Sequence, residues 1–115
     1  MQLLATHHVA LFTRNFAEME KFYSQTLGFP ITRRWDDVTI IFINVGSTTI
    51  ELIGRDTAPV PNSEPGAFNH LALHVANVDD AYKIKAEPKN FKDVRICFFF
   101  DPDGNTLELV QEMGI

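Results

Sequence analysis

An internal repeat is the feature of this 115-residue sequence that most constrains its fold. The stretch HHVALFTRNFAEME, starting at residue 7, aligns with NHLALHVANVDDAY, starting at residue 69, at a constant offset of 62 positions. A later pair, TTIELIG from residue 48 and NTLELVQ from residue 105, aligns at an offset of 57 positions. Because a repeated sequence predicts a repeated structural unit, we expect two copies of one module, the second shorter by five residues.

The first copy has the pattern of one strand, one helix and three further strands. Alternating apolar residues predict a strand over residues 6–13, and Asn15 with Glu18 predicts a capping box at the start of a helix. Gly28 and Pro30 end that helix. Three strands are then expected, over residues 31–35, 38–45 and 48–54.

The second copy repeats this order in fewer residues. It begins with a strand over residues 67–76 and a helix from Asn77, with Asp80 at the capping-box position. Pro88 breaks that helix early, so the missing residues fall within about residues 83–92. The sequence leaves open whether this segment keeps a shortened strand or forms an unusual loop. The last two strands are expected over residues 94–100 and 105–111, joined by a turn at 101–104.

The two copies together predict one domain of the α+β class, built from two tandem βαβββ modules with mixed sheets. We expect module 1 at about residues 1–55 and the abbreviated module 2 at about residues 67–115. The proline-rich segment RDTAPVPNSEPG predicts a linker at about residues 56–66. A chain of this length buries a sizeable core without disulfides.

Charge and composition exclude several classes of partner. Fifteen acidic residues against ten basic ones give a net charge of −5, and no basic run suits a nucleic-acid backbone. The longest apolar stretches are too short to span a membrane, and the N-terminus lacks a signal-peptide pattern. We therefore expect a cytoplasmic protein that binds neither nucleic acid nor membranes. The single cysteine, Cys97, lies in an apolar strand and is expected to be a buried thiol.

Two histidines and two glutamates recur at equivalent places in the repeat. His8 aligns with His70 in the first strand of each copy, and Glu51 aligns with Glu108 in the last strand. Two copies related by an approximate two-fold axis bring these four residues together. Two imidazoles and two carboxylates suit a divalent first-row ion such as zinc, nickel, cobalt, manganese or iron.

Strand parity separates these residues from their neighbours. Glu51 and Glu108 each lie between two apolar residues, so each carboxylate is expected on the opposite face of its sheet. One such glutamate alone would be assigned to a solvated face, whereas its recurrence with an upstream histidine favours a site. Parity also predicts that His7 and His8 point to opposite faces. We therefore expect His8→Ala to abolish metal binding and His7→Ala to leave it nearly intact.

Five segments together resemble the glyoxalase or vicinal oxygen chelate family: HHVAL, KFYSQTLGF, TTIEL, NHLAL and DPDGNTLELV. The resemblance covers nearly the whole chain and fails only around residues 83–92. It implies paired βαβββ modules whose curved sheets enclose a metal ion, and it implies a homodimer. Whether the site is completed within one chain or across the dimer stays open. The ligands that the resemblance implies are His8, Glu51, His70 and Glu108.

The resemblance implies a substrate with two adjacent oxygens that binds the metal ion. By this resemblance the chain is a lactoylglutathione lyase-like isomerase, which shifts a proton next to a carbonyl through a metal-stabilised enediolate, with glutathione as a cosubstrate. Glu108 is then the base and Glu51 its counterpart. Two alternatives stay open: a methylmalonyl-CoA epimerase-like enzyme, and a non-catalytic small-molecule-binding protein of the antibiotic-resistance type.

One departure from the family bears on the substrate. Bacterial enzymes of the glyoxalase I type typically place an arginine four residues after the first histidine to hold a glutathione carboxylate, and here that residue is Phe12. This departure puts glutathione in question.

Several other side chains have two interpretations each. The segment Arg33 to Trp35 forms an anion-binding lip or, as we expect, a solvated hairpin. His74 is a pocket or a packing residue, and we expect packing. Phe98 to Phe100 are expected to serve packing, with an apolar cavity as the alternative. Arg95 is expected to be a surface charge rather than a contact to a substrate carboxylate.

Overall fold

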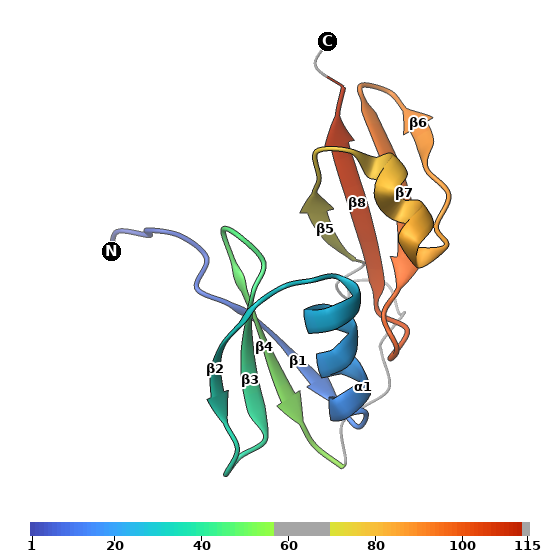
Figure 1. Cartoon of the computed structure of the whole chain (residues 1–115). Helices are drawn as coiled ribbons and strands as arrows, with labels where there is room; N and C mark the ends of the chain where they lie inside the picture. The colour runs from blue at the N-terminus through green and yellow to red at the C-terminus, as the bar shows by residue number, and fades with distance from the viewer. Residues whose placement is uncertain (57–69, 114–115) are drawn as a thin grey trace. The chain divides into compact units, whose positions relative to one another are not determined.

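The computed structural model describes residues 1–56 and 70–113 (Figure 1). The chain divides into two compact units, residues 1–60 and 61–115, which are described in turn. From residue 57 onward the predicted linker lies outside the described residues, as does the start of the strand predicted over residues 67–76. Among the helices of the described residues, none has the length and apolar character needed to cross a membrane.

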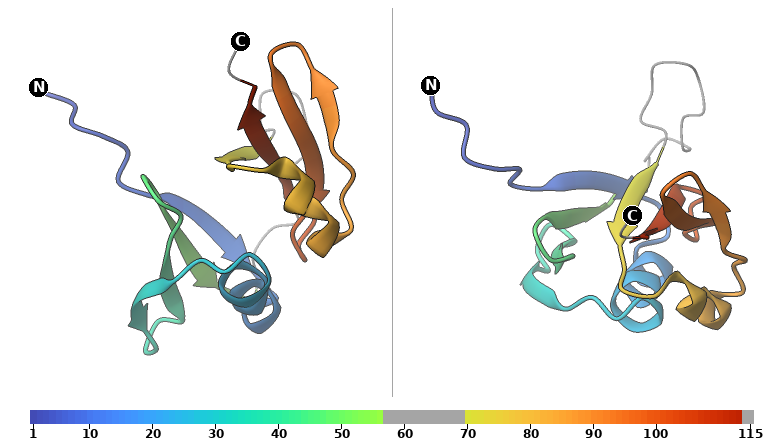
Figure 2. Two further views of the ribbon diagram at one scale, coloured as in Figure 1. Left: turned by 45° about the horizontal axis from the view of Figure 1, so that its top comes forward. Right: turned by 90° about the horizontal axis from the view of Figure 1, so that it is seen from above.

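The first unit contains a four-stranded mixed sheet in the order β1-β4-β3-β2. β1 runs parallel to β4, whereas β4 with β3 and β3 with β2 form antiparallel pairs. A helical segment between β1 and β2 lies across one face of this sheet (Figures 1 and 2). The strands have the bounds Val9–Thr13 (β1), Ile31–Trp35 (β2), Ile40–Asn44 (β3) and Thr49–Gly54 (β4).

That helical segment begins after Asn15 and ends before Gly28. Helix α1 spans Phe16–Lys21 and continues into the π-helical segment η1, Phe22–Thr26. The Asn15 side chain makes no capping hydrogen bond, so the predicted capping box is wrong. The Asn15 backbone N–H instead donates to Oγ1 of Thr13 at 2.9 Å. Gly28 has φ +82°, the left-handed conformation with which helices commonly end, so the predicted end of the helix is confirmed.

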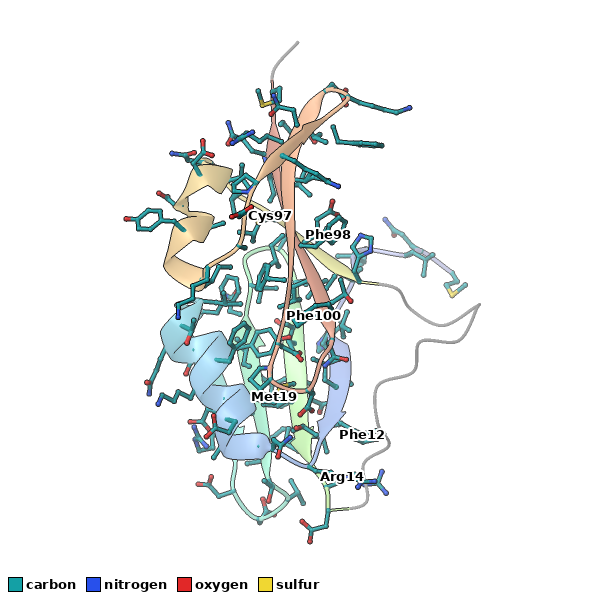
Figure 3. All side chains as sticks on the ribbon, turned by 90° about the vertical axis from the view of Figure 1, so that its right-hand side faces the viewer. Phe12, Arg14, Met19, Cys97, Phe98 and Phe100 are labelled. Atoms are coloured by element: carbon teal, nitrogen blue, oxygen red, sulfur yellow. The ribbon has the colours of Figure 1, made fainter. Side chains whose placement is uncertain are left out.

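One face of the first sheet is packed against this helix. Met19 of α1 and Tyr23 of η1 are fully buried, and Figure 3 shows Met19 pointing at the sheet. Buried residues of β3 and β4 complete this core: Ile41, Ile43, Ile50 and Leu52. Side chains alternate along a strand, so Phe42 and Glu51, which lie between these residues, point to the other face. The core thus decides which side chains the open face presents.

The second unit repeats the same topology in the order β5-β8-β7-β6. β5 is parallel to β8, and the remaining pairs are antiparallel. The strands have the bounds Leu71–His74 (β5), Lys89–Phe91 (β6), Val94–Phe100 (β7) and Thr106–Glu112 (β8). The segment around residues 83–92 therefore keeps a strand, β6, shortened to three residues. The predicted α+β fold of two βαβββ modules is confirmed.

The helical segment of the second unit is a 3₁₀ helix, η2, at Val78–Ile84. The Asn77 side chain accepts a hydrogen bond from the Asp79 backbone N–H at 3.1 Å, so Asn77 caps the segment as predicted. The donor is Asp79 rather than Asp80 of the predicted capping box. Oε1 of Gln111 on β8 accepts from the Val78 N–H at 2.8 Å and ties η2 to the sheet. Lys85, at φ +57°, ends the segment before Pro88 is reached.

The core of the second unit lies between η2 and its sheet. Val78 and Ala81 of η2 pack against Cys97 of β7. In Figure 3 Cys97 lies on the η2 side of β7, and Phe98 lies on the other side. Burial raises the pKa of the Cys97 thiol, with a smaller opposing effect of a hydrogen bond with the Leu109 backbone. The expected buried thiol is confirmed, and its raised pKa makes it a poor nucleophile at neutral pH.

Candidate metal site

In the first unit a histidine and a glutamate meet on the open face of the sheet. His8 lies directly before β1, and Glu51 lies in the middle of β4. Nε2 of His8 is 3.5 Å from Oε1 of Glu51. The Glu51 side chain is only 15% exposed, whereas that of His8 is 36% exposed. The pair therefore has a sheltered carboxylate and an imidazole that solvent or a ligand can reach.

The second unit contains the equivalent pair. Nε2 of His70 is 3.1 Å from Oε1 of Glu108, and the two side chains are 32% and 13% exposed. The strand register is also equivalent, because Ala10 pairs with Glu51 and Ala72 pairs with Glu108. The repeat seen in the sequence is thus reproduced in the strand pairing that brings each histidine to its glutamate.

The carboxylates face away from the helical cores, as strand parity predicts. Ile50 and Leu52, on either side of Glu51, are fully buried against the helical segment. Leu107 is buried beside Glu108 in the same way. Both glutamates are largely covered, which argues against the solvated face considered for a single glutamate.

Each histidine also packs against one phenylalanine from the neighbouring strand. The His8 ring meets Phe42 edge to face at a centroid distance of 6.2 Å, and His70 meets Phe98 at 5.5 Å in the same orientation. Phe42 pairs with Glu51 across β3 and β4, and Phe98 pairs with Glu108 across β7 and β8. Each pair therefore has an aromatic side chain beside it that limits the positions the imidazole can take.

Phe42 and Phe98 were not predicted from the sequence as residues of the site. The stretch IIFIN of β3 aligns with ICFFF of β7 at an offset of 56 positions, not 57, because the second hairpin has one more residue in its turn. The alignment of the two stretches at this third offset is the sequence signal that reveals both phenylalanines.

The prediction that His7 and His8 point to opposite faces is wrong. β1 begins only at Val9, so neither histidine lies in the strand. Their Nδ1 atoms are 2.8 Å apart, and their rings meet edge to face with centroids 5.1 Å apart. One Nδ1 donates to the other, and the Nε2 of His8 remains directed at Glu51. His7 is thus a neighbour of the candidate ligand rather than a residue of the opposite face.

The four predicted ligands lie as two pairs, one in each unit. His8 is brought to Glu51, and His70 is brought to Glu108. Within residues 1–56 and 70–113 no cluster of three or more histidine, cysteine, aspartate or glutamate side chains has metal-binding geometry. Each pair supplies one imidazole nitrogen and one carboxylate oxygen, which are donor atoms of the kind that divalent first-row ions accept.

The two arginines of β2 have different surroundings. Nη2 of Arg34 is 2.7 Å from Oε2 of Glu20 on α1, and Nη1 of Arg34 is 3.8 Å from Oδ1 of Asp36. The hydrogen bond to Glu20 raises the pKa of Arg34 above its usual value. Arg33 has a different setting, over the rings of Trp35 and Phe42.

The remaining side chains that the sequence singled out take ordinary positions. Arg95 is 2.8 Å from Oδ1 of Asp79, which makes it a surface ion pair as expected. His74 is exposed at the end of β5, so the expectation that it serves packing is wrong. Phe99 is buried and serves packing as expected. Phe98 and Phe100 are exposed on the other face of β7 (Figure 3), so for these two residues the expectation is wrong.

Comparisons with known proteins support one family. The model described as the Glyoxalase/Bleomycin resistance protein/Dioxygenase superfamily matches residues 5–109. The uncharacterised protein YwkD of Bacillus subtilis (strain 168) is 30% identical, with 97% of this chain and 100% of YwkD covered.

Two solved structures are similar over most of the chain. The trypanothione-dependent glyoxalase I of Leishmania major has 25% identity and a TM-score of 0.68, covering 91% of this chain and 84% of its own. TnmS3, an antibiotic binding protein from Streptomyces sp. CB03234, has a TM-score of 0.78 at 24% identity, covering 97% and 98%. The likeness to TnmS3 shows a shared fold.

Proposed function

Because the chain belongs to the Glyoxalase/Bleomycin resistance protein/Dioxygenase superfamily, we propose that it is a metal-dependent lyase or isomerase of the glyoxalase I type. Such an enzyme removes a proton from a carbon next to a carbonyl and returns a proton to the neighbouring carbon. The observation that carries the proposal is the repeated His–Glu pair, which occurs once in each unit with the same strand register.

The donor set fits a divalent ion: zinc, nickel, cobalt, manganese or iron. The ligands are then His8, Glu51, His70 and Glu108. When bound, such an ion acts as a Lewis acid and stabilises negative charge on two adjacent substrate oxygens. The fit rests on the pairing of each Nε2 with a carboxylate oxygen at 3.5 and 3.1 Å.

Glu108 is the proposed base. Its carboxylate lies beside the His70 ring and is mostly covered, which leaves it poorly hydrated. Phe98 packs against the same imidazole and presents an apolar surface next to the carboxylate. Glu51, in the equivalent position of the first unit, is its counterpart. The choice of Glu108 over Glu51 follows the resemblance to the family.

Glutathione remains the proposed cosubstrate, despite Phe12. The guanidinium of Arg55 lies 4.7 Å from the centroid of the Phe12 ring, so a cation lies beside the residue that replaces the family's arginine. The protein is proposed to act as a homodimer on a small molecule with adjacent oxygens.

A non-catalytic binding protein is the second candidate, and the structural likeness to TnmS3 favours it. The open faces carry exposed aromatic side chains, Phe12, Trp35, Phe98 and Phe100, that suit an apolar ligand. A methylmalonyl-CoA epimerase-like enzyme remains the alternative within catalysis.

Activity assays of the metal-loaded protein test the proposal. We expect isomerisation of the methylglyoxal–glutathione adduct, with epimerisation of methylmalonyl-CoA assayed beside it. Loss of a general base typically lowers rates by about 100- to 10,000-fold, and this is the expected effect of Glu108→Gln on kcat. Glu112→Gln, which changes an exposed carboxylate further along β8, is the matched control and keeps wild-type activity.

The outcomes separate the parts of the proposal. If the metal-loaded wild type converts neither substrate, the glyoxalase assignment fails and ligand binding becomes the better account. If Glu108→Gln retains its metal ion and turns over at the wild-type rate, Glu108 is not the base.

A further inference from the structure

A row of paired residues crosses the first sheet from the histidine–glutamate pair to its far edge. The pairing of β1 with β4, of β4 with β3 and of β3 with β2 aligns one residue from each strand, in the order Ala10, Glu51, Phe42 and Arg33. Paired residues on neighbouring strands point to the same face, so Arg33 shares the open face with Glu51. Their backbones are two strand spacings apart, or about 10 Å.

The Arg33 side chain lies against two aromatic rings, those of Trp35 and Phe42. Its guanidinium carbon is 5.7 Å from the centroid of the Trp35 ring and 5.8 Å from that of Phe42. The two rings meet each other edge to face at 5.1 Å, and Phe42 in turn contacts His8. These contacts place the guanidinium on the side of the pair where β2 forms the sheet edge.

The charge of Arg33 is not used by an ion pair. Within the described residues no carboxylate lies within salt-bridge distance of Arg33, whereas the adjacent Arg34 is bound to Glu20 on the helical face. Cation–π contacts leave the donors at the edge of a guanidinium free for an anion. A planar guanidinium over aromatic rings therefore combines an anion-binding group with an apolar platform.

We propose that Arg33 binds a carboxylate of the substrate, while Trp35 and Phe42 support its apolar or planar middle part. The inference rests on the proposed function, since the other end of the substrate carries the adjacent oxygens that would bind the proposed metal ion. The substrate class is thus an anionic compound whose carboxylate is separated from its adjacent oxygens by an apolar or planar spacer.

The second unit has no counterpart to this contact in its shortened strand. β6 pairs with β7 only from Lys89 opposite Ile96 to Phe91 opposite Val94, so no residue of β6 pairs with Phe98. The five residues lost from the repeat remove the part of the strand that carries Arg33 in the first unit. The carboxylate contact is therefore made by one unit, which gives the substrate a defined direction.

Two hydroxamate probes test the contact. Benzohydroxamate offers adjacent oxygens and a planar ring, and 4-carboxybenzohydroxamate adds a distal carboxylate. Trp35 is the only tryptophan in the chain, so its fluorescence reports binding next to Arg33. We expect the metal-loaded wild type to bind the carboxylated probe more tightly than benzohydroxamate. This difference in affinity is expected to be smaller at high salt.

Variants of the two neighbouring arginines test whether Arg33 causes the tighter binding of the carboxylated probe. Arg33→Gln is expected to weaken the carboxylated probe by about tenfold and to leave benzohydroxamate unchanged, since a hydrogen bond to a charged group is lost. Arg34→Gln changes a charge at the next position on the other face and is expected to affect neither probe. Arg33→Lys keeps the charge and is expected to retain part of the gain.

Each outcome decides the proposal. The proposal is overturned if Arg33→Gln still binds the carboxylated probe more tightly than benzohydroxamate. It is also overturned if Arg34→Gln loses this difference to the same extent. If benzohydroxamate does not bind the metal-loaded wild type, the metal proposal fails. Benzoate titrated onto the metal-free protein then decides the arginine contact: quenching of Trp35 that Arg33→Gln abolishes supports it, and absence of quenching overturns it.

Discussion

The imidazole of His8 is held from three directions. Its Nδ1 lies 2.8 Å from His7, its Nε2 lies 3.5 Å from Glu51, and Phe42 packs against its ring. When Nδ1 of His8 donates the hydrogen bond to His7, its Nε2 carries no proton and is available as a ligand. The His7 contact therefore suits binding through Nε2, the atom already directed at Glu51.

This contact changes the expected effect of His7. Removal of a hydrogen-bonding partner of a metal ligand typically costs about 10- to 100-fold in affinity, so His7→Ala should weaken metal binding by about tenfold. His8→Ala should abolish it, and His74→Ala, which removes an exposed histidine at the end of β5, should leave it unchanged. Isothermal titration with a divalent ion measures all three. Unchanged affinity in His7→Ala contradicts this role and restores the expectation from the sequence.

Individual site residues differ in how far the sequence reveals them. His8, Glu51, His70 and Glu108 were found because the repeat aligns them at the offsets 62 and 57. The contact between His7 and His8 could not be found, because it depends on β1 beginning at Val9.

At the level of elements, strand pairing determines where a strand begins, which hydrophobic periodicity alone does not show. The bounds of β2 and β7 were predicted correctly from apolar runs enclosed by turns. β1 was predicted to start at residue 6, but the first residue of β1 to pair is Val9, opposite Ile50. β4 begins only at Thr49, so the residues before Val9 have almost no partner strand.

In each unit the first residue of the helical segment contacts the last strand, by van der Waals packing in the first unit and by a hydrogen bond in the second. In the first unit Gly54 lies against Phe16, and in the second Gln111 accepts a hydrogen bond from Val78. A Cβ built on Gly54 lies 2.7 Å from Cγ2 of Thr39 and 3.0 Å from Cδ2 of Phe16. Glycine at this position lets the helix and the β2–β3 turn approach β4 closely.

Gly54→Ala is therefore expected to destabilise the protein. Overpacking of this kind typically lowers the free energy of unfolding by about 1–3 kcal/mol. Urea denaturation followed by circular dichroism measures the change. Thr39→Ser removes the methyl group at the closest contact, so the double variant should recover part of the loss. A loss that is the same with and without Thr39→Ser contradicts the steric explanation.

At the level of the whole molecule, each unit contains one histidine–glutamate pair. One imidazole and one carboxylate are two ligands, whereas a divalent first-row ion commonly takes four. The pairs His8 with Glu51 and His70 with Glu108 are therefore proposed to serve one ion together. Whether one chain or two chains supply the four ligands, we expect one ion for each chain.

The metal content of the protein purified without chelators tests this central claim most directly. We expect one divalent ion per chain in the wild type, and loss of that ion in both His8→Ala and His70→Ala, although these residues belong to different units. Circular dichroism of the variants shows that the fold is kept. A wild type without a stoichiometric ion, or variants that each keep half of the metal, would contradict the account.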